Sequence, residues 1–214
     1  MKRRKNHLTA KALSLRLAVV ALAMVLLACL LGLYTPFSSQ VIDQREKEFA
    51  TGPLEVLDSQ QFDAYRAYLS GNDHCLNLLF CRFTVFGGWG NYGGTILDLS
   101  QEEGPLWVDT AMYTGARNIE DGAFYDNHLF GRVDVDGAKS VRVLFPSWED
   151  GQPLELPLFL GEDSHWYFWG WHTVQWEDWE TDYFDIDVEV LDSAGNVLYT
   201  YETLPSYTEE ELAG

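Results

Sequence analysis

The chain has 214 residues and a formal net charge of −19, and 47% of its residues are hydrophobic. This hydrophobic content excludes an intrinsically disordered chain, because it suffices for a packed core. The acidity excludes a nucleic-acid-binding protein, since 33 Asp and Glu against 14 Lys and Arg would repel a phosphate backbone.

The charges are divided unevenly along the chain. Residues 1–16 contain no acid, so all 33 Asp and Glu lie beyond this segment. We predict that residues 1–16 form a basic cytoplasmic tail. Its cations are Lys2, Arg3, Arg4, Lys5, Lys11 and Arg16.

The segment after this tail predicts a membrane anchor. Residues 17–34 carry no charge and would span about 27 Å as a helix, close to the thickness of the hydrocarbon core. We therefore expect a transmembrane helix over residues 17–37, which makes the protein a single-pass protein of the cell membrane in contact with the lipid bilayer. The positive-inside rule predicts a cytoplasmic N-terminus and an extracytoplasmic C-terminal domain. A cleaved signal peptide and a lipoprotein modified at Cys29 remain alternatives.

Two helical segments are expected before the strands begin. The polar residues 38–53 are compatible with a helix and are predicted to form a juxtamembrane stalk. A short helix is then expected from Asp58, because Phe62, Tyr65 and Leu69 recur at helical spacing and Gly71 suits a helix end. This helix would pack on the sheet that follows.

Short strands separated by turns fill the rest of the chain. We expect strands over Leu76–Phe86, Thr95–Leu99, Leu106–Met112, His128–Val135, Ser140–Phe145, Leu154–Leu160, His165–Trp171, Phe184–Leu191 and Val197–Tyr201. The Asp136-Gly137 pair predicts a hairpin between the fourth and fifth of these. The predicted fold class is mainly β: an N-terminal transmembrane helix is followed by an antiparallel β-sandwich with one short packed helix.

The exported domain divides into three predicted parts. Residues 54–125 would contain the short helix and the first strands, residues 126–204 the second part of the sandwich, and residues 205–214 an acidic flexible tail. The Asp136-Gly137 turn, the strand HWYFWGW and the terminal FDIDVEVLDSAGNVLYTY carry a resemblance to the immunoglobulin-like sandwiches of exported bacterial proteins. The resemblance covers less than half of the chain and implies an architecture without an activity.

Two local motifs are weighed against chemical functions. Residues 88–93 match the pattern G-x-G-x-x-G, but a strand follows them where a dinucleotide site requires a helix. We therefore expect a glycine-rich loop and no cofactor. Cys75 and Cys81 are candidates for a disulfide, although an extended segment between them would hold them too far apart, and two free buried thiols are the preferred interpretation.

The densest feature is the aromatic segment over residues 166–179. As a strand it would place Tyr167, Trp169 and Trp171 on one side. Together with Trp176 and Trp179, these are the predicted ligand-binding residues, an exposed platform that could stack on sugar rings. The competing interpretation is a core strand covered by the N-terminal part of the domain.

No catalytic or metal-binding signature is found in the sequence. We therefore predict a membrane-tethered extracytoplasmic interaction domain, an accessory or regulatory protein of the cell envelope that binds an envelope protein. One alternative is a module that binds cell-wall glycans, and another is an envelope hydrolase, which would require two convergent carboxylates.

Overall fold

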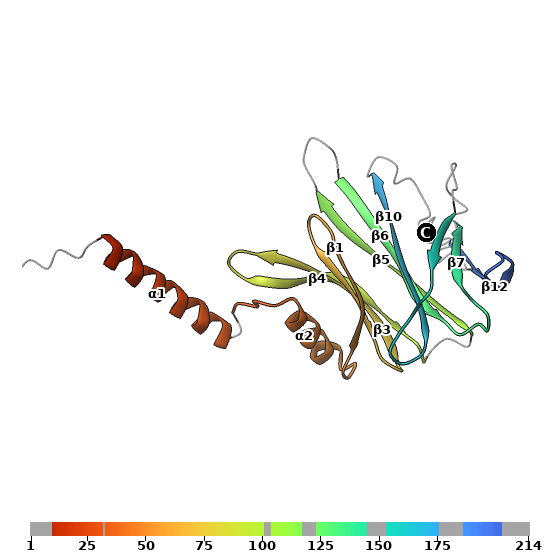
Figure 1. The fold of residues 1–214 in the computed structure, drawn as a ribbon, viewed down its shortest axis with the longest axis horizontal. Coiled ribbons are helices and arrows are strands. Elements are labelled where there is room, and N and C mark those ends of the chain that lie inside the picture. Colours follow the sequence, from red (N-terminus) through yellow and green to blue (C-terminus); the bar gives the residue numbers. More distant parts are fainter. Residues whose placement is uncertain are drawn as a thin grey trace, which may run out of the picture.

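The computed structural model of the protein describes residues 10–31, 33–100, 104–116, 123–144, 153–175 and 186–202. Within these residues the chain forms two helices and three four-stranded antiparallel sheets, so it is mainly β as predicted (Figure 1). Helix α1 projects from one end of the body formed by the sheets, whereas helix α2 lies against it.

Helix α1 (Ala10–Leu30) carries Lys11 and Arg16 in its first turns and is apolar around its whole circumference from Leu17 on. Its leucine and valine side chains are exposed, and the described chain buries none of the stretch Lys11–Leu30. By length and composition this helix could cross a membrane. It begins and ends earlier than the predicted span 17–37, because the residues from Lys11 to Arg16 also favour a helix and the chain near Thr35 instead bonds to a strand.

Helix α2 (Ser39–Phe49) occupies the segment that we predicted as a stalk. Its amphipathic face buries Val41 and Ile42 against the outer side of the first sheet. The helix ends at Ala50, which adopts a left-handed conformation with φ 52°. The segment is thus a separate helix packed on the domain, and it does not continue α1.

The strands assemble into sheets that we name A, B and C. Sheet A has the order β1 (Glu55–Gln61), β2 (Arg66–Gly71), β3 (Cys75–Thr84) and β4 (Gly88–Asp98). Sheet B has the order β5 (Leu106–Ala116), β6 (Ala123–Val133), β10 (Trp166–Gln175) and β9 (Phe159–Leu160). Sheet C has the order β12 (Val197–Glu202), β11 (Asp187–Leu191), β7 (Ser140–Leu144) and β8 (Leu154–Pro157).

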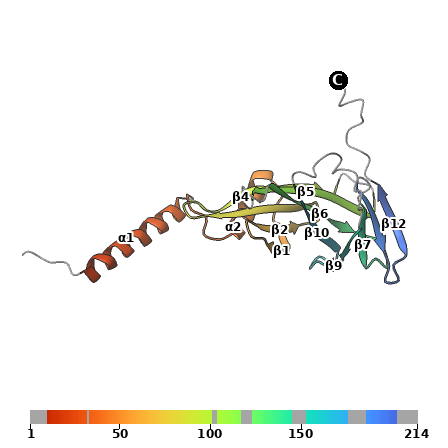
Figure 2. The same cartoon turned by 90° about the horizontal axis from the view of Figure 1, so that it is seen from above.

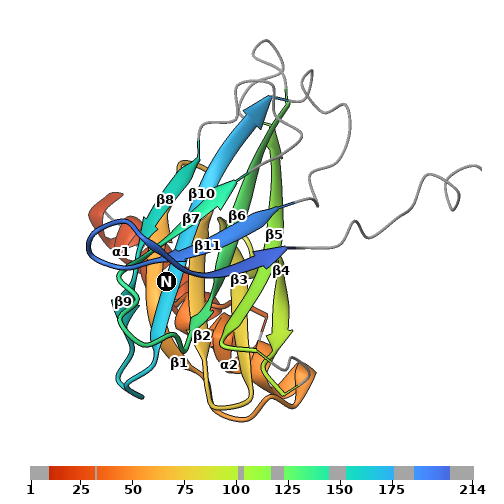
Figure 3. The ribbon, with the colours of Figure 1, turned by 90° about the vertical axis from the view of Figure 1, so that its right-hand side faces the viewer.

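Sheet B lies between the other two sheets. One of its faces packs on sheet A in a core that contains Phe80, Phe130 and Tyr167. Its other face packs on sheet C in a second core, in which Phe168 meets Val188. Strands β11 and β12 run across β5 and β6 at a wide angle (Figure 3), and Figure 2 shows the order of the layers from another side.

The short helix expected from Asp58 is wrong. Strands β1 and β2 pair antiparallel there, and the chain turns between Gln61 and Arg66. Consecutive residues of β2 are buried on both faces, because α2 covers one face of sheet A and sheet B covers the other. A strand buried on both faces lacks the alternation of polar and apolar residues, so its pattern was mistaken for a helix.

Two expected turns also differ from the structure. The glycine-rich segment belongs to strand β4, which pairs with β3 across a bulge, and it is not a loop. Gly137 does adopt the positive φ of a turn, but β6 and β7 lie in different sheets. The predicted hairpin at Asp136-Gly137 is therefore a crossing between sheets B and C, because β5 and β10 already occupy both edges of β6.

Other local predictions are confirmed. The turn from Asp192 to Asn196 joins β11 and β12 as an antiparallel hairpin, held by the Asp192 carboxylate. Residues 161–164 likewise join β9 to β10. The predicted acidic tail at 205–214 lies outside the described residues, as does part of the strand predicted from Phe184.

A glycine allows close packing within sheet B. A Cβ atom on Gly131 would lie 2.0 Å from the Trp107 carbonyl oxygen and 2.7 Å from the Phe168 ring. We expect Gly131→Ala to lower the free energy of unfolding by about 1–3 kcal/mol, because the backbone and the ring must move apart. Chemical denaturation will measure this loss. Gly90→Ala is the matched control, since no atom lies within 4 Å of its added methyl group, and an equal loss in both variants would contradict the packing argument.

Candidate functional site

A buried polar network lies between sheets A and B and is centred on His128. This histidine is on β6, directly opposite Trp171 of β10, and its side chain is fully buried. Tyr65 reaches it from the turn between β1 and β2. Alternation along β6 points Asp126, His128 and Phe130 toward the same face, so this interface receives polar and aromatic groups together.

Four hydrogen bonds connect the members of this network. The indole N–H of Trp169 donates to Nδ1 of His128 over 3.2 Å. Because Nδ1 accepts, Nε2 carries the ring proton and donates to the Tyr65 hydroxyl oxygen at 2.8 Å. The Tyr65 hydroxyl in turn donates to the Asp126 carboxylate at 2.9 Å, and the Thr173 hydroxyl donates to its other oxygen at 2.6 Å. The network thus fixes one tautomer of a neutral imidazole.

The surroundings of His128 hold it in this neutral form. Burial lowers the pKa of His128 from 6.5 to about 4, and the charge of Asp126 opposes this shift only in part. Protonation of Nδ1 would also remove the acceptor that the Trp169 indole requires. A histidine with both nitrogens engaged and no access to solvent is suited to joining sheets and cannot exchange protons with an external substrate.

Aromatic rings surround the network. Tyr65 stacks on Tyr113 with ring centroids 3.7 Å apart and on Phe62 at 4.5 Å. Phe80 lies 4.9 Å from the His128 ring. These contacts exclude water, which strengthens the hydrogen bonds inside the cluster.

The predicted ligand-binding residues divide by exposure. Tyr167 is fully buried and Trp169 is 8% exposed, so neither can present a ring face to a ligand. Their burial corrects the expected exposed row and has a direct cause, since β10 belongs to the central sheet. Trp171 shares their side of the strand but is 40% exposed, with its ring edge-to-face on Phe62 at 5.0 Å. Trp176 and Trp179 lie outside the described residues.

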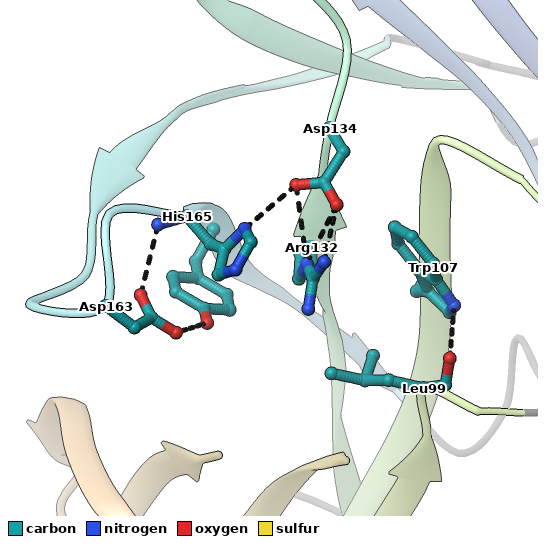
Figure 4. A network of polar contacts seen from close by, with 7 residues as sticks. Leu99, Trp107, Arg132, Asp134, Asp163 and His165 are labelled. Atoms are coloured by element: carbon teal, nitrogen blue, oxygen red, sulfur yellow. Dashed lines mark hydrogen bonds and ion pairs between the residues drawn. The ribbon is translucent and has the colours of Figure 1, made fainter. Parts of the chain in front are cut away.

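A second polar cluster lies where β6, β5 and the β9–β10 turn meet (Figure 4). Asp134 binds the Arg132 guanidinium at 2.5 Å and the His165 ring at 3.2 Å. Partial burial opposes ionisation of Asp134, but these two groups outweigh it and hold the pKa of its carboxyl below the usual range. The Arg132 guanidinium lies 4.7 Å from the centre of the Trp107 ring.

The β9–β10 turn is tied to the same region. Asp163 accepts a hydrogen bond from the Tyr167 hydroxyl and another from the His165 backbone N–H at 3.1 Å. Burial raises the pKa of Tyr167, and the bonded Asp163 carboxylate raises it further. The phenol therefore stays protonated and acts as a donor that positions the turn.

The two candidate disulfide residues are free thiols. Cys75 and Cys81 both lie on β3 and are buried, and the five residues of extended strand between them hold their Cα atoms about 20 Å apart. Burial raises the pKa of the Cys81 thiol to about 12, which makes it a poor nucleophile at neutral pH.

Among the described residues, no group of three or more His, Cys, Asp or Glu side chains could hold a metal ion. Glu55, Asp73 and Asp163 do line an open depression beside the β1–β2 edge. Glu55 is exposed, and slight desolvation together with the nearby Glu162 and Asp163 carboxylates raises its pKa.

The neutral histidine predicts a specific pH dependence. In the unfolded chain His128 titrates near pH 6.5, so acid stabilises the unfolded state first, and stability falls between pH 6.5 and about pH 4. The pKa difference predicts a loss of about 3 kcal/mol across this window. Urea unfolding at a series of pH values will measure it. In His128→Gln, which cannot titrate, the free energy of unfolding should be lower at pH 7 but should decline less toward pH 4, whereas equal declines would contradict this assignment.

No protein-family model matches the chain, and comparisons with curated proteins and with solved structures found no significant match. Inference about function therefore depends on the geometry of the described residues.

Proposed function

We propose that the protein is a membrane-tethered, extracytoplasmic interaction domain that serves as an accessory or regulatory subunit in the cell envelope. The observation that carries this proposal is α1, an apolar helix whose stretch Lys11–Leu30 makes no buried contact with the described chain. Exposed leucines and valines over such a length are stable only when another apolar phase covers them. A lipid bilayer is the phase that fits a helix of this length.

The charge distribution supports one orientation for this anchor. The six cations of residues 1–16 precede the uncharged residues 17–34, and all 33 acids follow them. The positive-inside rule keeps such a tail in the cytoplasm and sends the sheets across the membrane. An acidic domain outside the cell membrane is also repelled by anionic headgroups, which favours contacts made away from the lipid surface.

The sheets support a binding function more than a catalytic one. His128 and Asp126 are the most buried acid–base pair described, and both form hydrogen bonds within the protein, to Tyr65, Trp169 and Thr173. These bonds occupy the groups that a catalytic acid or base would need. We propose the immunoglobulin-like assignment for sheets B and C, which are antiparallel and pack face to face through one core. The wide angle at which β11 and β12 cross β5 and β6 (Figure 3) departs from the nearly aligned packing of that fold. Such folds present loops and edges to partners. The hydrolase alternative gains no support from this geometry.

The glycan-binding alternative is favoured by one observation. Trp171 exposes 40% of its surface, and Phe62 supports its ring from the side. An exposed, braced indole is suited to stacking on a sugar ring. This alternative needs only a single ring, since Tyr167 and Trp169 are buried.

The anchor is tested by membrane extraction and protease accessibility. With a tag at each end and expression in a bacterial host, we expect the chain to resist alkaline carbonate and its C-terminal tag to be digested only from outside the cell membrane. The double substitution Val20→Arg and Leu22→Arg should release it, because two charges in the hydrocarbon core are costly. The matched control is Val197→Arg with Leu198→Arg, which adds the same charges to exposed apolar positions on β12.

The outcomes separate the alternatives. Loss of the N-terminal tag from the mature protein would show a cleaved signal peptide and would overturn the anchor. Extraction of the unmodified chain by alkaline carbonate would also overturn the anchor.

The glycan alternative is tested by the exposed indole alone. If a cell-wall glycan stacks on Trp171, Trp171→Ala should reduce glycan binding about 5- to 150-fold, taking the about 1–3 kcal/mol that stacking on one aromatic ring contributes for nucleobases. Pull-down on insoluble glycan, with thermal melting to verify folding, will measure it. Tyr92→Ala is the control, since Tyr92 is an exposed aromatic residue on β4. Equal binding by both variants, or no binding by the unmodified chain, would eliminate this alternative.

A further inference from the structure

The hairpin formed by β3 and β4 ends in an exposed apolar tip, which we define as residues 83–87. Phe86 is 96% exposed and Val85 is 76% exposed, and Phe83 beside them is 46% exposed. Large apolar side chains at such exposure are unfavourable in water, and together they form one cluster at a turn. Something apolar is therefore expected to cover this tip in the working protein.

The tip is bonded to the chain that leaves α1. The Thr35 backbone N–H donates to the Gly87 carbonyl oxygen at 3.1 Å, and the Trp89 N–H donates to the Thr35 carbonyl oxygen at 2.8 Å. Thr35 thereby forms a parallel bridge with Gly88. In Figures 1 and 2 the tip of the β3–β4 hairpin lies beside the C-terminal end of α1.

A glycine makes this attachment feasible. Gly88 has φ 73°, and a Cβ atom there would lie 2.2 Å from the Thr35 carbonyl oxygen. Side chains rarely adopt this φ, and none would fit against that oxygen. The attachment therefore depends on this glycine. The hydrogen bonds of Thr35 hold the tip close to the chain that follows the apolar helix.

The charge around the tip also differs from that of the rest of the chain. From His74 to Leu97 there is no Asp or Glu, although the protein contains 33 of them. The single charge in this stretch is Arg82, whose guanidinium lies 5.6 Å from the centre of the Tyr92 ring. An acid-free hairpin with one cation and several aromatic residues can approach anionic lipid headgroups without repulsion.

We propose that the β3–β4 tip inserts into the interfacial region of the bilayer that α1 spans. Phe86 and Val85 would enter the boundary between headgroups and acyl chains, continuing the exposed apolar surface of Leu33 and Phe37. The protein would then contact the membrane at two points, α1 and the tip, and these contacts would fix the orientation of the domain relative to the bilayer. This inference rests on the proposed anchor.

A lipid surface fits this tip better than a protein partner. The tip is a turn that projects from sheet A toward the C-terminal end of α1 (Figures 1 and 2). A bilayer interface accepts a protruding turn without a matching pocket, whereas a protein would have to supply one. Cys75–Cys81 are buried and would lack acids in any surroundings, but the exposed residues from Arg82 to Tyr92 also carry none, which suits a place next to negative charge.

Depth-dependent quenching of a fluorophore tests the inference on the full chain. In the Cys29→Ser background, single cysteines at Phe86, at Leu22 of α1 and at Ala194 of the β11–β12 turn carry the same environment-sensitive dye. The labelled chain is placed in vesicles of phosphatidylcholine and phosphatidylglycerol, with or without phosphatidylcholine that bears a quencher near its headgroup. Cys75 and Cys81 are buried, and the unsubstituted background corrects for their residual labelling.

We expect blue-shifted, lipid-quenched emission at Phe86→Cys, and red-shifted, unquenched emission at Ala194→Cys. Val85→Cys provides a second position at which Phe86 is retained, and it should behave like Phe86→Cys. If Leu22→Cys is shielded from water while both tip positions resemble Ala194→Cys, the inference is wrong and the anchor stands. If Leu22→Cys is exposed to water, the anchor fails, and the inference that depends on it fails as well.

Discussion

The central sheet of this protein must bury both of its faces, and the other layers are arranged around this constraint. Sheet B packs on sheet A through one core and on sheet C through another. Strand β10 therefore carries Tyr167 and Trp169 toward sheet A and Phe168 toward sheet C. An aromatic residue at nearly every position is what such a strand requires, because large rings fill the space between sheets on both sides. Sheet A is in turn covered on its outer side by α2, so the layers follow in the order α2, sheet A, sheet B and sheet C.

Burying polar groups in one of these interfaces gives it a defined geometry. An apolar interface between two sheets tolerates small shifts, whereas the chain of donors from Trp169 through His128 and Tyr65 to Asp126 is complete only in one register. The same arrangement makes the interface sensitive to acid, because its central ring accepts a hydrogen bond that a protonated imidazole cannot accept. The stability of the contact between sheets A and B and its pH dependence thus have a common cause.

The sequence predicted features that depend on neighbours along the chain. The apolar helix, the β11–β12 hairpin and the sharing of one side by Tyr167, Trp169 and Trp171 follow from local spacing, and the structure has them. The errors arose where burial depends on distant layers: β2 has no alternation because it is covered twice, and Asp136-Gly137 joins two sheets because β6 already has two neighbours. His128 was missed, although Asp126, His128 and Phe130 alternate along β6 and so mark a polar inward face. The pairing of Tyr65 with this face joins residues far apart in sequence, and no local pattern could reveal it.

The distribution of acids links the fold to its orientation. Strands of sheet C carry carboxylates such as the half-buried Glu189, which pairs with Arg142 at 3.1 Å. This sheet lies at the end of the body remote from α1, whereas the acid-free hairpin of β3 and β4 lies beside it (Figure 1). Helix α2 at the same end carries Asp43, Glu46 and Glu48, so the β3–β4 hairpin is a local acid-free surface there and not part of a gradient. A local surface of this kind is expected where one part of a domain faces lipid headgroups. If the anchor spans a bilayer, the surface remote from it, including the edges of sheet C, is the one a partner in the envelope could reach.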